Sequence, residues 1–478
     1  MFVVLAFSYC AVNPVTGKKQ VALMSEAQEI AMGAESDPQI VAQFGLYPDS
    51  NLQRFINQKG MEMARISHRP NLKWTFRVLD SDVINAFAVP GGYVYFTRGI
   101  LAAMNNEAQF AGVLGHEIGH VTARHSVSQQ TSSMLTQLGV MAAVIANRNV
   151  AQFANELSQG AQLLMLSFSR KHESESDELG VEYSSKVGYN ATYMADFFRT
   201  LQRQQQSSGH AALPEFLSTH PDPGNRFERV QQLASAYQTA NGLVPEKLNI
   251  RRNEYLQVVQ GIMYGENPRH GFVENGVFYH PDLKFQFATP TGWRYQNTPQ
   301  QVLFSAPAGD AMCFLALAKG KTPQEAATNF AQTHKIQVAS QQNTNFNGLS
   351  GLVVQGSQVQ ANAQGQAAGS VQLTAAFVAY NGLVYELVGA STPQVFQNYL
   401  PQFNQMQNSM RSLTNAAMLN VKPERIVLYK LPKAATLQQV LQDQKMPAQR
   451  FSELAILNGL ELGDNIPAQT TIKLVRRS

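Results

Sequence analysis

VLGHEIGHVTARH, residues 113–125, contains three histidines and one glutamate within ten positions. His116 and His120 are four residues apart, so on an α-helix they lie about 40° apart on one face. Two imidazoles in that arrangement can bind one Zn²⁺ ion. Glu117 follows the first of them, where it can take a proton from a zinc-activated water and later deliver it to a leaving amine. The stretch therefore predicts a helix that carries a metal site.

The other residues of this helix fit the same placement. Its apolar residues lie on roughly the opposite face, where the helix can pack into the core: Leu114, Ile118 and Val121. Three glycines keep the surface near the metal side flat: Gly112, Gly115 and Gly119. Each costs roughly 1 kcal/mol relative to alanine in a helix interior. We therefore expect that close packing or access at this face outweighs helix stability.

His125 is the nearest candidate for a third ligand, but its spacing is unfavourable. It lies nine residues beyond His116, which is about 180° around a continuing helix. The metzincin pattern would place a glycine at position 123 and a histidine at position 126. This chain has Ala123 and Ser126 there. We therefore expect His125 to be a structural or surface histidine.

A better candidate for the third ligand lies in SFSRKHESESDELGVEY, residues 167–183. Glu173 and Asp177 are again four residues apart and share a helical face. One of the two carboxylates can complete the metal site and leave one position open. The other can accept the free N–H of a ligand histidine and fix its tautomer. The alternative is a solvated acidic face, formed by Glu173, Glu175, Asp177 and Glu178; after an HExxH helix we favour the metal site.

The composition is that of a globular protein of two or three domains. The chain has 478 residues, of which 44% are hydrophobic and 15% charged, and a single core does not usually grow to this size. Lys and Arg exceed Asp and Glu by only 37 − 33 = 4 and form no long run, so we expect no nucleic-acid partner. No segment reaches the ~18–20 apolar residues that span a bilayer. LGVMAAVIA, residues 138–146, predicts either a buried core helix or a membrane-facing lid.

Residues 1–24 are interpreted as a leader or lipoprotein-like N-terminus. MFVVLAFSYC, residues 1–10, is typical of the apolar tail of a secretory or lipoprotein leader. We expect a lipid on Cys10 and a location in the periplasm or cell envelope of a bacterium. Tyr9 is larger than the residue such signals prefer, and a merely hydrophobic N-terminus is the alternative. The other cysteine, Cys313, either pairs with Cys10 or stays a separate buried thiol.

We expect one domain at each end of the chain, before and after a middle region at 271–415. Residues 25–265 predict a mainly helical domain in which Ser25 caps the first helix. Within it VINAFAVPGGYVYF, residues 83–96, predicts a short β-hairpin. Residues 424–478 predict a small unit in the order strand, helix, helix, strand.

The middle region, residues 271–415, predicts an α+β domain. It is rich in β-branched and aromatic residues, and Asn381-Gly382 between two such runs is a strong hairpin signal. TPQEAATNFAQTH, residues 322–334, predicts one helix, and Thr392-Pro393 opens a second. That second helix carries an apolar stripe that we expect in the core: Phe396, Leu400, Phe403, Met406 and Met410. Pro401 is expected to kink or split it.

Five sequence blocks in a fixed order resemble a known family, the zinc metallopeptidases that include the CAAX prenyl protease, HtpX, BepA and LoiP. The resemblance runs from about residue 11 to residue 262. The blocks are NPVTGKKQ (13–20), NAFAVPGGYVYF (85–96), HEIGH (116–120), SRKHESESD (169–177) and STHPDPGNR (218–226). The resemblance implies a multidomain fold in which a zincin-like, mainly α metalloprotease domain with a short β-hairpin or sheet precedes the α+β domain.

The resemblance also implies a role for each residue that matches the family motif. One Zn²⁺ per chain would be bound by His116, His120 and Glu173. Glu117 would be the catalytic base and Asp177 the partner of a ligand histidine. His220 and Arg226 would border the site, the histidine approaching and occluding the metal and the arginine assisting substrate or transition-state binding. Asn85, Ala86, Phe87 and Ala88 would form an edge strand that pairs with an extended substrate. The family usually has alanine where this chain has Ser176.

Two weaker resemblances concern the rest of the chain. Residues 271–415 are similar to PsbP-like α/β/α domains, and residues 424–478 to a degenerate LysM module. The second likeness rests on the surroundings of Leu457-Asn458 and Ile466-Pro467-Ala468. Ala434-Ala435-Thr436 replaces the usual Gly-Asp-Thr start of a LysM module.

Three hypotheses for the function follow. The first is a metalloendopeptidase of the bacterial envelope that hydrolyses misfolded or misassembled polypeptides. The second is a chaperone-like or scaffold protein with structural or occluded zinc, whose C-terminal domains bind envelope proteins. The third is a peptidoglycan-binding module, which requires the altered LysM-like unit to be functional.

Overall fold

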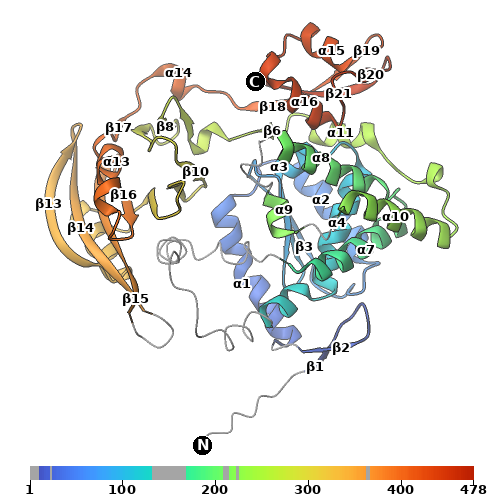
Figure 1. Cartoon of the computed structure of the whole chain (residues 1–478), viewed down its shortest axis with the longest axis horizontal. Coiled ribbons are helices and arrows are strands. Elements are labelled where there is room, and N and C mark those ends of the chain that lie inside the picture. Colours follow the sequence, from blue (N-terminus) through green and yellow to red (C-terminus); the bar gives the residue numbers. More distant parts are fainter. Residues whose placement is uncertain are drawn as a thin grey trace, which may run out of the picture. The chain divides into compact units, whose positions relative to one another are not determined.

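The computed structural model describes residues 10–21, 24–131, 168–207, 215–221, 225–361 and 367–477. The chain divides into two compact units (Figure 1), and each is described by itself. Of the described residues, unit 1 combines those from 10 to 131, from 168 to 266 and from 423 to 477, and unit 2 combines those from 267 to 422. The predicted helix or lid at 138–146 and the predicted leader residues 1–9 lie outside the described residues. Among those that are described, no helix is long and apolar enough to cross a membrane.

Unit 1 begins with a small hairpin and a capped helix. Strand β1 (Cys10–Val12) pairs antiparallel with β2 (Lys19–Val21). Helix α1 (Glu26–Phe44) starts at Ser25, whose side chain accepts a hydrogen bond from the Gln28 backbone N–H while the Gln28 side chain accepts one from the Ser25 N–H. Such a capping box satisfies two N–H groups that the first helical turn leaves open. The N-cap predicted at Ser25 is therefore confirmed.

A three-stranded sheet follows, in the order β3 (Thr75–Leu79), β5 (Tyr93–Thr97), β4 (Ala86–Val89). β4 and β5 are antiparallel and form the predicted hairpin, and β3 is parallel to β5. Gly91 and Gly92 turn the hairpin with φ of 83° and 99°, a region that glycine enters without steric cost. Because β4 pairs on one side only, it is an edge strand of this sheet.

Helices make up most of the rest of unit 1. They are α2 (Ser50–Ala64), α3 (Arg98–Ala103), α4 (Glu107–Thr122), α7 (Arg170–Lys186), α8 (Tyr193–Ser207), α9 (Glu215–Thr219), α10 (Arg226–Ala240), the 3₁₀ turn η2 (Pro245–Lys247) and α11 (Arg252–Val259). Every residue of α4 is buried. α4 is the helix predicted from the opening stretch, and Leu114, Ile118 and Val121 lie in the core as expected. It therefore runs through the centre of the unit.

Glycines allow α4 and α7 to pack against each other at very short range (Figure 1). A Cβ on Gly115 would lie 3.0 Å from the Gly180 carbonyl oxygen. A Cβ on Gly180 would lie 3.0 Å from the Gly112 carbonyl oxygen and 3.2 Å from the His116 backbone nitrogen. Gly119 faces the Cβ of Leu179 in the same way. The expectation of close packing at the glycine face is confirmed.

Gly180→Ala should push α4 and α7 apart, because the atoms that its Cβ would meet are backbone atoms that cannot rotate away. We expect unit 1 to lose about 1–3 kcal/mol of stability, measured by urea unfolding, and to bind less zinc. Glu178→Ala, on the exposed side of the same helix, is the control. Equal stability and equal zinc content in the two variants would contradict the glycine contact.

Residues 423–478 form the predicted strand–helix–helix–strand order. Their elements are β18 (Glu424–Lys430), β19 (Ala435–Thr436), α15 (Leu437–Asp443), the 3₁₀ turn η4 (Ala448–Arg450), α16 (Phe451–Asn458), β20 (Asn465–Ile466) and β21 (Thr471–Arg477). β18 lies between β21 and β6 (Met263–Tyr264) in one antiparallel sheet. The likeness to a LysM module stays a prediction.

These C-terminal residues are part of unit 1 instead of a separate body. Ile426 and Leu474 are buried in the same apolar cluster as Phe110 of the metal-site helix. The fully buried Lys473 donates hydrogen bonds of 2.8 and 2.9 Å to the carbonyl oxygens of Ala102 and Met104. These carbonyls lie at the end of α3, where a helix leaves such groups without a partner of its own.

Unit 2 contains a seven-stranded antiparallel sheet and a four-stranded one. The larger has the order β10 (Arg294–Asn297), β11 (Gln301–Ser305), β12 (Ala311–Leu317), β16 (Leu383–Ser391), β15 (Ala367–Tyr380), β14 (Leu349–Ala361), β13 (Gln337–Phe346). The smaller has the order β17 (Arg411–Ser412), β9 (Phe285–Ala288), β8 (Val277–His280), β7 (Phe272–Glu274). Unit 2 also contains η3 (Pro268–His270) and α14 (Ala416–Leu419). Asn381 and Gly382 join β15 to β16 with φ of 49° and 78°, so the predicted hairpin is confirmed.

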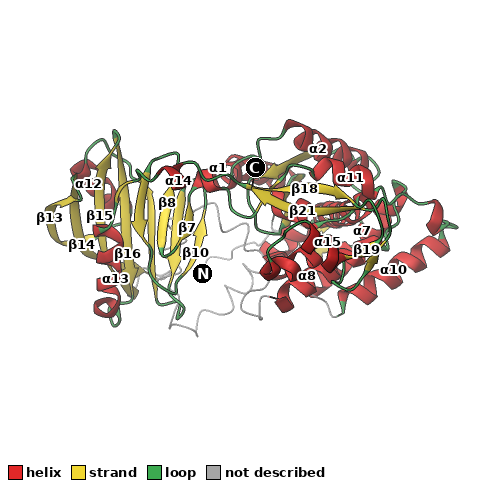
Figure 2. Cartoon of the chain, turned by 90° about the horizontal axis from the view of Figure 1, so that it is seen from above, coloured by secondary structure: helices red, strands yellow, loops and turns green. Residues whose placement is uncertain are grey.

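Two helices pack on opposite faces of the larger sheet (Figure 2). α12 (Pro323–Thr333) is the predicted helix at 322–334 and packs on the face that carries Phe314. α13 (Phe396–Asn408) and the smaller sheet pack on the face that carries Leu315. The predicted stripe on α13 lies in this second core, with Leu400 partly buried. α13 continues through Pro401, so the helix is not split. Cys313, in the same core, is a free buried thiol.

Candidate metal centre

Four side chains from three segments converge in the core of unit 1. His116 and His120 come from α4, Glu173 from the first turn of α7, and His220 from the residue after α9. All four are almost completely buried. One ligand atom of each lies within 4.8 Å of the others. The structure thus brings together the three predicted ligands and the predicted bordering histidine.

The separations between these ligand atoms suit a small tetrahedral cation. His116 Nε2 lies 3.0 Å from His120 Nε2 and 3.3 Å from His220 Nδ1. The Glu173 carboxylate lies 3.4 Å from each of the two Nε2 atoms of α4, and 3.2 Å from His220 Nδ1. Zinc bonds of about 2.0–2.1 Å imply about 3.3 Å between neighbouring ligand atoms. The set of nitrogen and carboxylate donors also matches zinc.

His116 is oriented by Asp177, which lies one turn beyond Glu173 on α7. His116 Nδ1 is 3.0 Å from Asp177 Oδ1, so Nδ1–H donates to the carboxylate and the lone pair of Nε2 faces the centre. Burial and the Arg226 guanidinium oppose protonation of His116, but hydrogen bonds to Asp177 and Glu173 raise its pKa to about 9. Asp177 itself is buried, and the adjacent positive groups lower its pKa. This is the arrangement predicted for Asp177.

His120 is oriented by a residue that the sequence did not assign to the site. His120 Nδ1 lies 3.0 Å from His125 Nδ1, and His125 Nε2 lies 3.3 Å from Glu175 Oε2. The carboxylate can only accept, so Nε2 of His125 carries the hydrogen and its Nδ1 accepts from His120. The hydroxyl of Ser176 is also 3.2 Å from His125 Nδ1. Burial keeps the pKa of His120 well below its usual value, so this ligand is neutral, as metal binding requires.

The prediction for His125 assumed that the helix continues, and this was wrong. α4 ends at Thr122, and Arg124 adopts a left-handed backbone with φ of 58°. The backbone therefore changes direction after the helix. As a result, the His125 ring contacts the His120 ring on the side that faces away from the metal site. His125 is buried and is not one of the converging donors. It is a structural histidine, as expected, but one in direct contact with a ligand.

A hydrogen bond orients His220 as the fourth donor of the site, beside His116, His120 and Glu173. Its Nε2 lies 3.3 Å from the carbonyl oxygen of Ala86 on β4. A carbonyl can only accept, so Nε2 carries the hydrogen and the lone pair of Nδ1 faces the centre. The ring also stacks on Phe216, with centroids 4.5 Å apart. The position that a substrate carbonyl or water would need is therefore filled by a side chain.

Glu117 lies beside the four donors without a hydrogen bond. Its side chain is fully buried, and within the described part of the chain neither carboxylate oxygen has a hydrogen-bond partner. His220 Nε2 lies 3.6 Å from Glu117 Oε1. Burial raises the pKa of Glu117, and the adjacent histidines counteract this only in part. An unsatisfied buried carboxylate is costly, which is typical of a group kept for chemistry instead of stability.

Arg226 and the predicted substrate strand complete the surroundings. The Arg226 guanidinium donates to Asp177 Oδ1 at 2.6 Å, lies 3.2 Å from Glu173 Oε2 and packs over the Phe198 ring. Residues 85–88 contribute to the edge strand β4, and all four are buried. The segment that carries His220 lies along this edge. Arg226 thus contacts both carboxylates and holds them in place.

This constellation matches the class of HExxH metallopeptidases, with Glu173 in the place where that class has a distant glutamate as third ligand. Residues 50–234 match peptidase family M48, which supports the family predicted from the sequence. The predicted enzyme class, metalloendopeptidase, and the predicted metal, zinc, agree with this family and with the buried donors.

Curated relatives share this region. The chain is 31% identical over 254 residues to the beta-barrel assembly-enhancing protease of Escherichia coli (strain K12), which covers 51% of this chain and 50% of that protein. It is 27% identical over 275 residues to the mitochondrial metalloendopeptidase OMA1 of Bos taurus, covering 52% and 49%. The chain therefore spans about half the length of these relatives. The solution structure of a cyanobacterial PsbP from Synechocystis sp. PCC 6803 matches with 11% identity, over 31% of this chain and 98% of that protein. Its TM-score of 0.23 is too low to carry an argument.

His125→Ala should weaken zinc binding, because His120 then loses the acceptor that fixes its tautomer. Removing such a partner typically costs 10–100-fold in metal affinity, which a chelator competition can measure. His172→Ala is the control, since the His172 ring stacks on His125 with centroids 4.4 Å apart but is not among the converging donors. An unchanged zinc affinity in folded His125→Ala would contradict the contact.

Glu173→Ala should reduce the zinc content sharply at equilibrium with buffered metal, because it removes the carboxylate from the four converging donors and leaves only the three imidazoles. Glu178→Ala, one turn further along α7 and exposed, should keep one zinc per chain. Stoichiometric zinc in purified Glu173→Ala would show that another residue is the third ligand. Metal content by atomic emission on dialysed protein gives the answer.

Proposed function

We propose that this chain is a zinc-dependent endopeptidase of the bacterial cell envelope, acting on misfolded or misassembled polypeptides. One observation carries the proposal: a buried carboxylate with no hydrogen-bond partner, Glu117, lies next to a donor set that suits zinc. A purely structural zinc site has no use for such a group, because a structural site is closed by its ligands alone.

The proposed chemistry assigns each proton to an atom of this chain. Zinc, when bound, polarises the scissile carbonyl and the attacking water. Glu117 takes one proton from that water as its oxygen bonds to the carbonyl carbon. It then delivers the proton to the amide nitrogen as the C–N bond breaks. The raised pKa of Glu117 makes its carboxylate a stronger base, which favours the first of these transfers.

Two further residues act around the reacting bond. Arg226 lies within 3.2 Å of Glu173 and next to Asp177, where its positive charge can assist binding of the transition state. His220 must leave its position before a substrate enters, since its Nδ1 lies at the centre. The structure is therefore a resting state in the proposed cycle.

The proposed substrates are extended chains. β4 is an edge strand, and a polypeptide added to it would form main-chain hydrogen bonds that depend little on sequence. His220 holds the Ala86 carbonyl of that edge, so its departure frees both the metal and the strand. The name of the Escherichia coli relative, which refers to β-barrel assembly, supports an envelope role. Lipidation of Cys10 belongs to the same proposal.

One observation favours a second function. With His220 in the fourth position, the site has four protein donors, as in structural zinc sites. The chain would then be a chaperone-like or scaffold protein with occluded zinc. Partner binding by the C-terminal regions, to envelope proteins or to peptidoglycan, belongs to this alternative.

Cleavage of casein separates the two functions. We expect zinc-loaded wild type to cleave it, and Glu117→Gln, with equal zinc, to be about 10²–10⁴-fold slower because the proton acceptor is lost. His220→Ala should be at least as active as wild type, since it opens the site.

Zinc content and unfolding midpoints of all three proteins serve as controls. If neither the wild type nor His220→Ala exceeds Glu117→Gln while each holds one zinc, the peptidase proposal fails. The occluded-zinc alternative then stands.

A further inference from the structure

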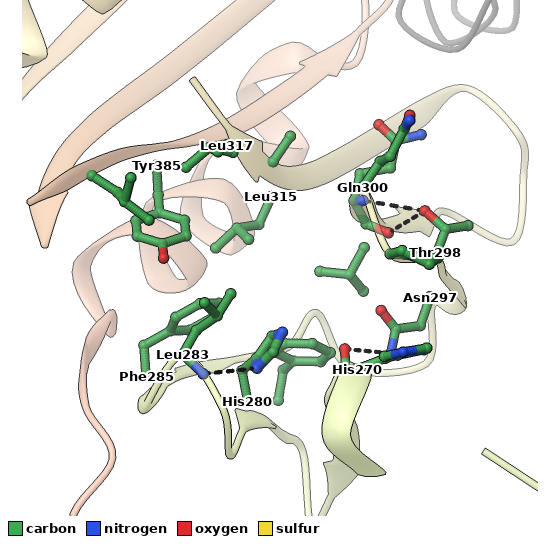
Figure 3. Close-up of a pocket in the computed structure, with 16 residues that line it drawn as sticks. His270, His280, Leu283, Phe285, Asn297, Thr298, Gln300, Leu315, Leu317 and Tyr385 are labelled. Carbon is green, nitrogen blue, oxygen red and sulfur yellow. Dashed lines mark hydrogen bonds between the residues drawn. The ribbon is translucent and has the colours of Figure 1, made fainter. Parts of the chain in front are cut away.

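Unit 2 contains an apolar cavity of about 150 Å³ between its two sheets. Figure 3 shows Phe285, Leu315 and Tyr385 around this space, with Leu317 at its edge. An apolar cavity of this size accommodates one benzene molecule. It can therefore take a single apolar side chain, whereas a lipid acyl chain would be too long for it.

Three of the residues that line this cavity are exposed leucines. Leu283, Leu317 and Leu383 all line it and are 37%, 55% and 42% exposed. They come from three places in the chain: the β8–β9 connection, the end of β12 and the start of β16. Scattered apolar residues on a surface need no explanation, but three around one cavity indicate an interaction site.

A second cavity, of about 600 Å³, lies on the other face of the larger sheet, beside α12. Glu386 of β16 lines it together with Phe314 and Phe330, and Lys319 and His334 also contribute to its wall. Among the described residues, the Glu386 carboxylate has neither a hydrogen bond nor an ion pair within 4.0 Å. Lys319, the cation that faces it most directly, is exposed. Burial raises the pKa of Glu386 to about 7, and Lys319 opposes this only weakly.

The second cavity is complementary to a cationic side chain. A carboxylate without a partner and two aromatic rings are the groups that favour an ammonium or guanidinium ion. An anionic ligand would instead place like charges together. The cost of keeping Glu386 half-buried is offset once a cation enters.

The two cavities share an edge, where the β10–β11 turn meets the end of β12. The residues that line both are Pro299, Gln300, Gln301, Ala316 and Leu317. Two of these carry amide side chains, which can both donate to and accept from a peptide backbone. The apolar first cavity, the two glutamine amides and the Glu386 carboxylate thus follow one another around the end of the sheet.

We propose that unit 2 binds an extended polypeptide segment, with an apolar side chain in the cavity between the three leucines and a lysine or arginine beside Glu386. This site contains no residue of the metal centre. The binding therefore does not depend on peptidase activity, and its failure would leave the proposed function untouched.

Fluorescence anisotropy tests the proposal on the full-length, zinc-loaded chain with Glu117→Gln, which prevents cleavage of the probe. The probes are labelled Gly/Ser peptides that carry one leucine and one lysine at a series of spacings. We expect one or more spacings to bind. Glu386→Gln should weaken that binding at least about tenfold, because a charged partner is lost. Leu317→Ser should weaken it as well.

The control is Glu274→Gln, which changes an exposed carboxylate on β7 of the same unit. It should bind like the parent protein. Replacing the probe's lysine by glutamine should weaken binding to the parent but not to Glu386→Gln, since the two changes remove the same contact. Absence of binding at every spacing, or equal affinity of the Glu386 and Glu274 variants, would overturn the proposal. So would n-hexylamine binding as tightly as the peptide.

Unfolding of the unliganded protein gives an independent measurement. If Glu386 is kept for binding, Glu386→Gln should leave unit 2 as stable as the parent or more stable, because it removes a half-buried charge without a partner. A clear loss of stability would identify Glu386 as a structural residue and overturn its assignment to a ligand.

Discussion

The metal site depends on the close contact of α4 with α7. At Gly115 and Gly180 the two helices approach so closely that a Cβ at either position would lie 3.0 Å from a backbone carbonyl oxygen, tighter than ordinary contact. Only at this separation can a short carboxylate on α7 reach imidazoles on α4. Any larger side chain between the helices would move Glu173 and Asp177 away together, since both lie on the same helix face. The stability lost by glycine in helices is thus the cost of bringing the ligands together.

A second constraint acts on the rings themselves. Each of the three histidines at the centre has an acceptor on the nitrogen that faces away from the metal. Asp177 serves His116, His125 serves His120, and the Ala86 carbonyl serves His220. The other three nitrogens therefore face one place before any metal arrives, and metal binding displaces the proton that His116 carries there. Because one acceptor belongs to β4, movement of His220 is coupled to the strand proposed for substrate binding.

The residues after the peptidase region have two different relations to it. Residues 423–478 share the core of unit 1, and Lys473 closes the end of α3, directly before the N-cap of α4. Part of the support of the metal helix is therefore encoded more than 300 residues downstream of it. Unit 2 has its own cores and its own cavities, and its chemistry is separate from that of the centre.

Local spacing in the sequence was enough to predict the helix with His116 and His120, the carboxylate pair on α7 and the hairpins at 83–96 and 381–382. These features depend on the helical and strand periods, which neighbouring residues express directly. The helical period predicted the wrong position for His125. The helix ends where Arg124 adopts a left-handed backbone conformation, and no glycine in the sequence indicates that end. The partners of His120, the carbonyl that holds His220 and the cavity at Glu386 arise from segments far apart in the chain. Only the tertiary structure determined them, since periodicity describes the direction of a side chain but not what lies opposite it.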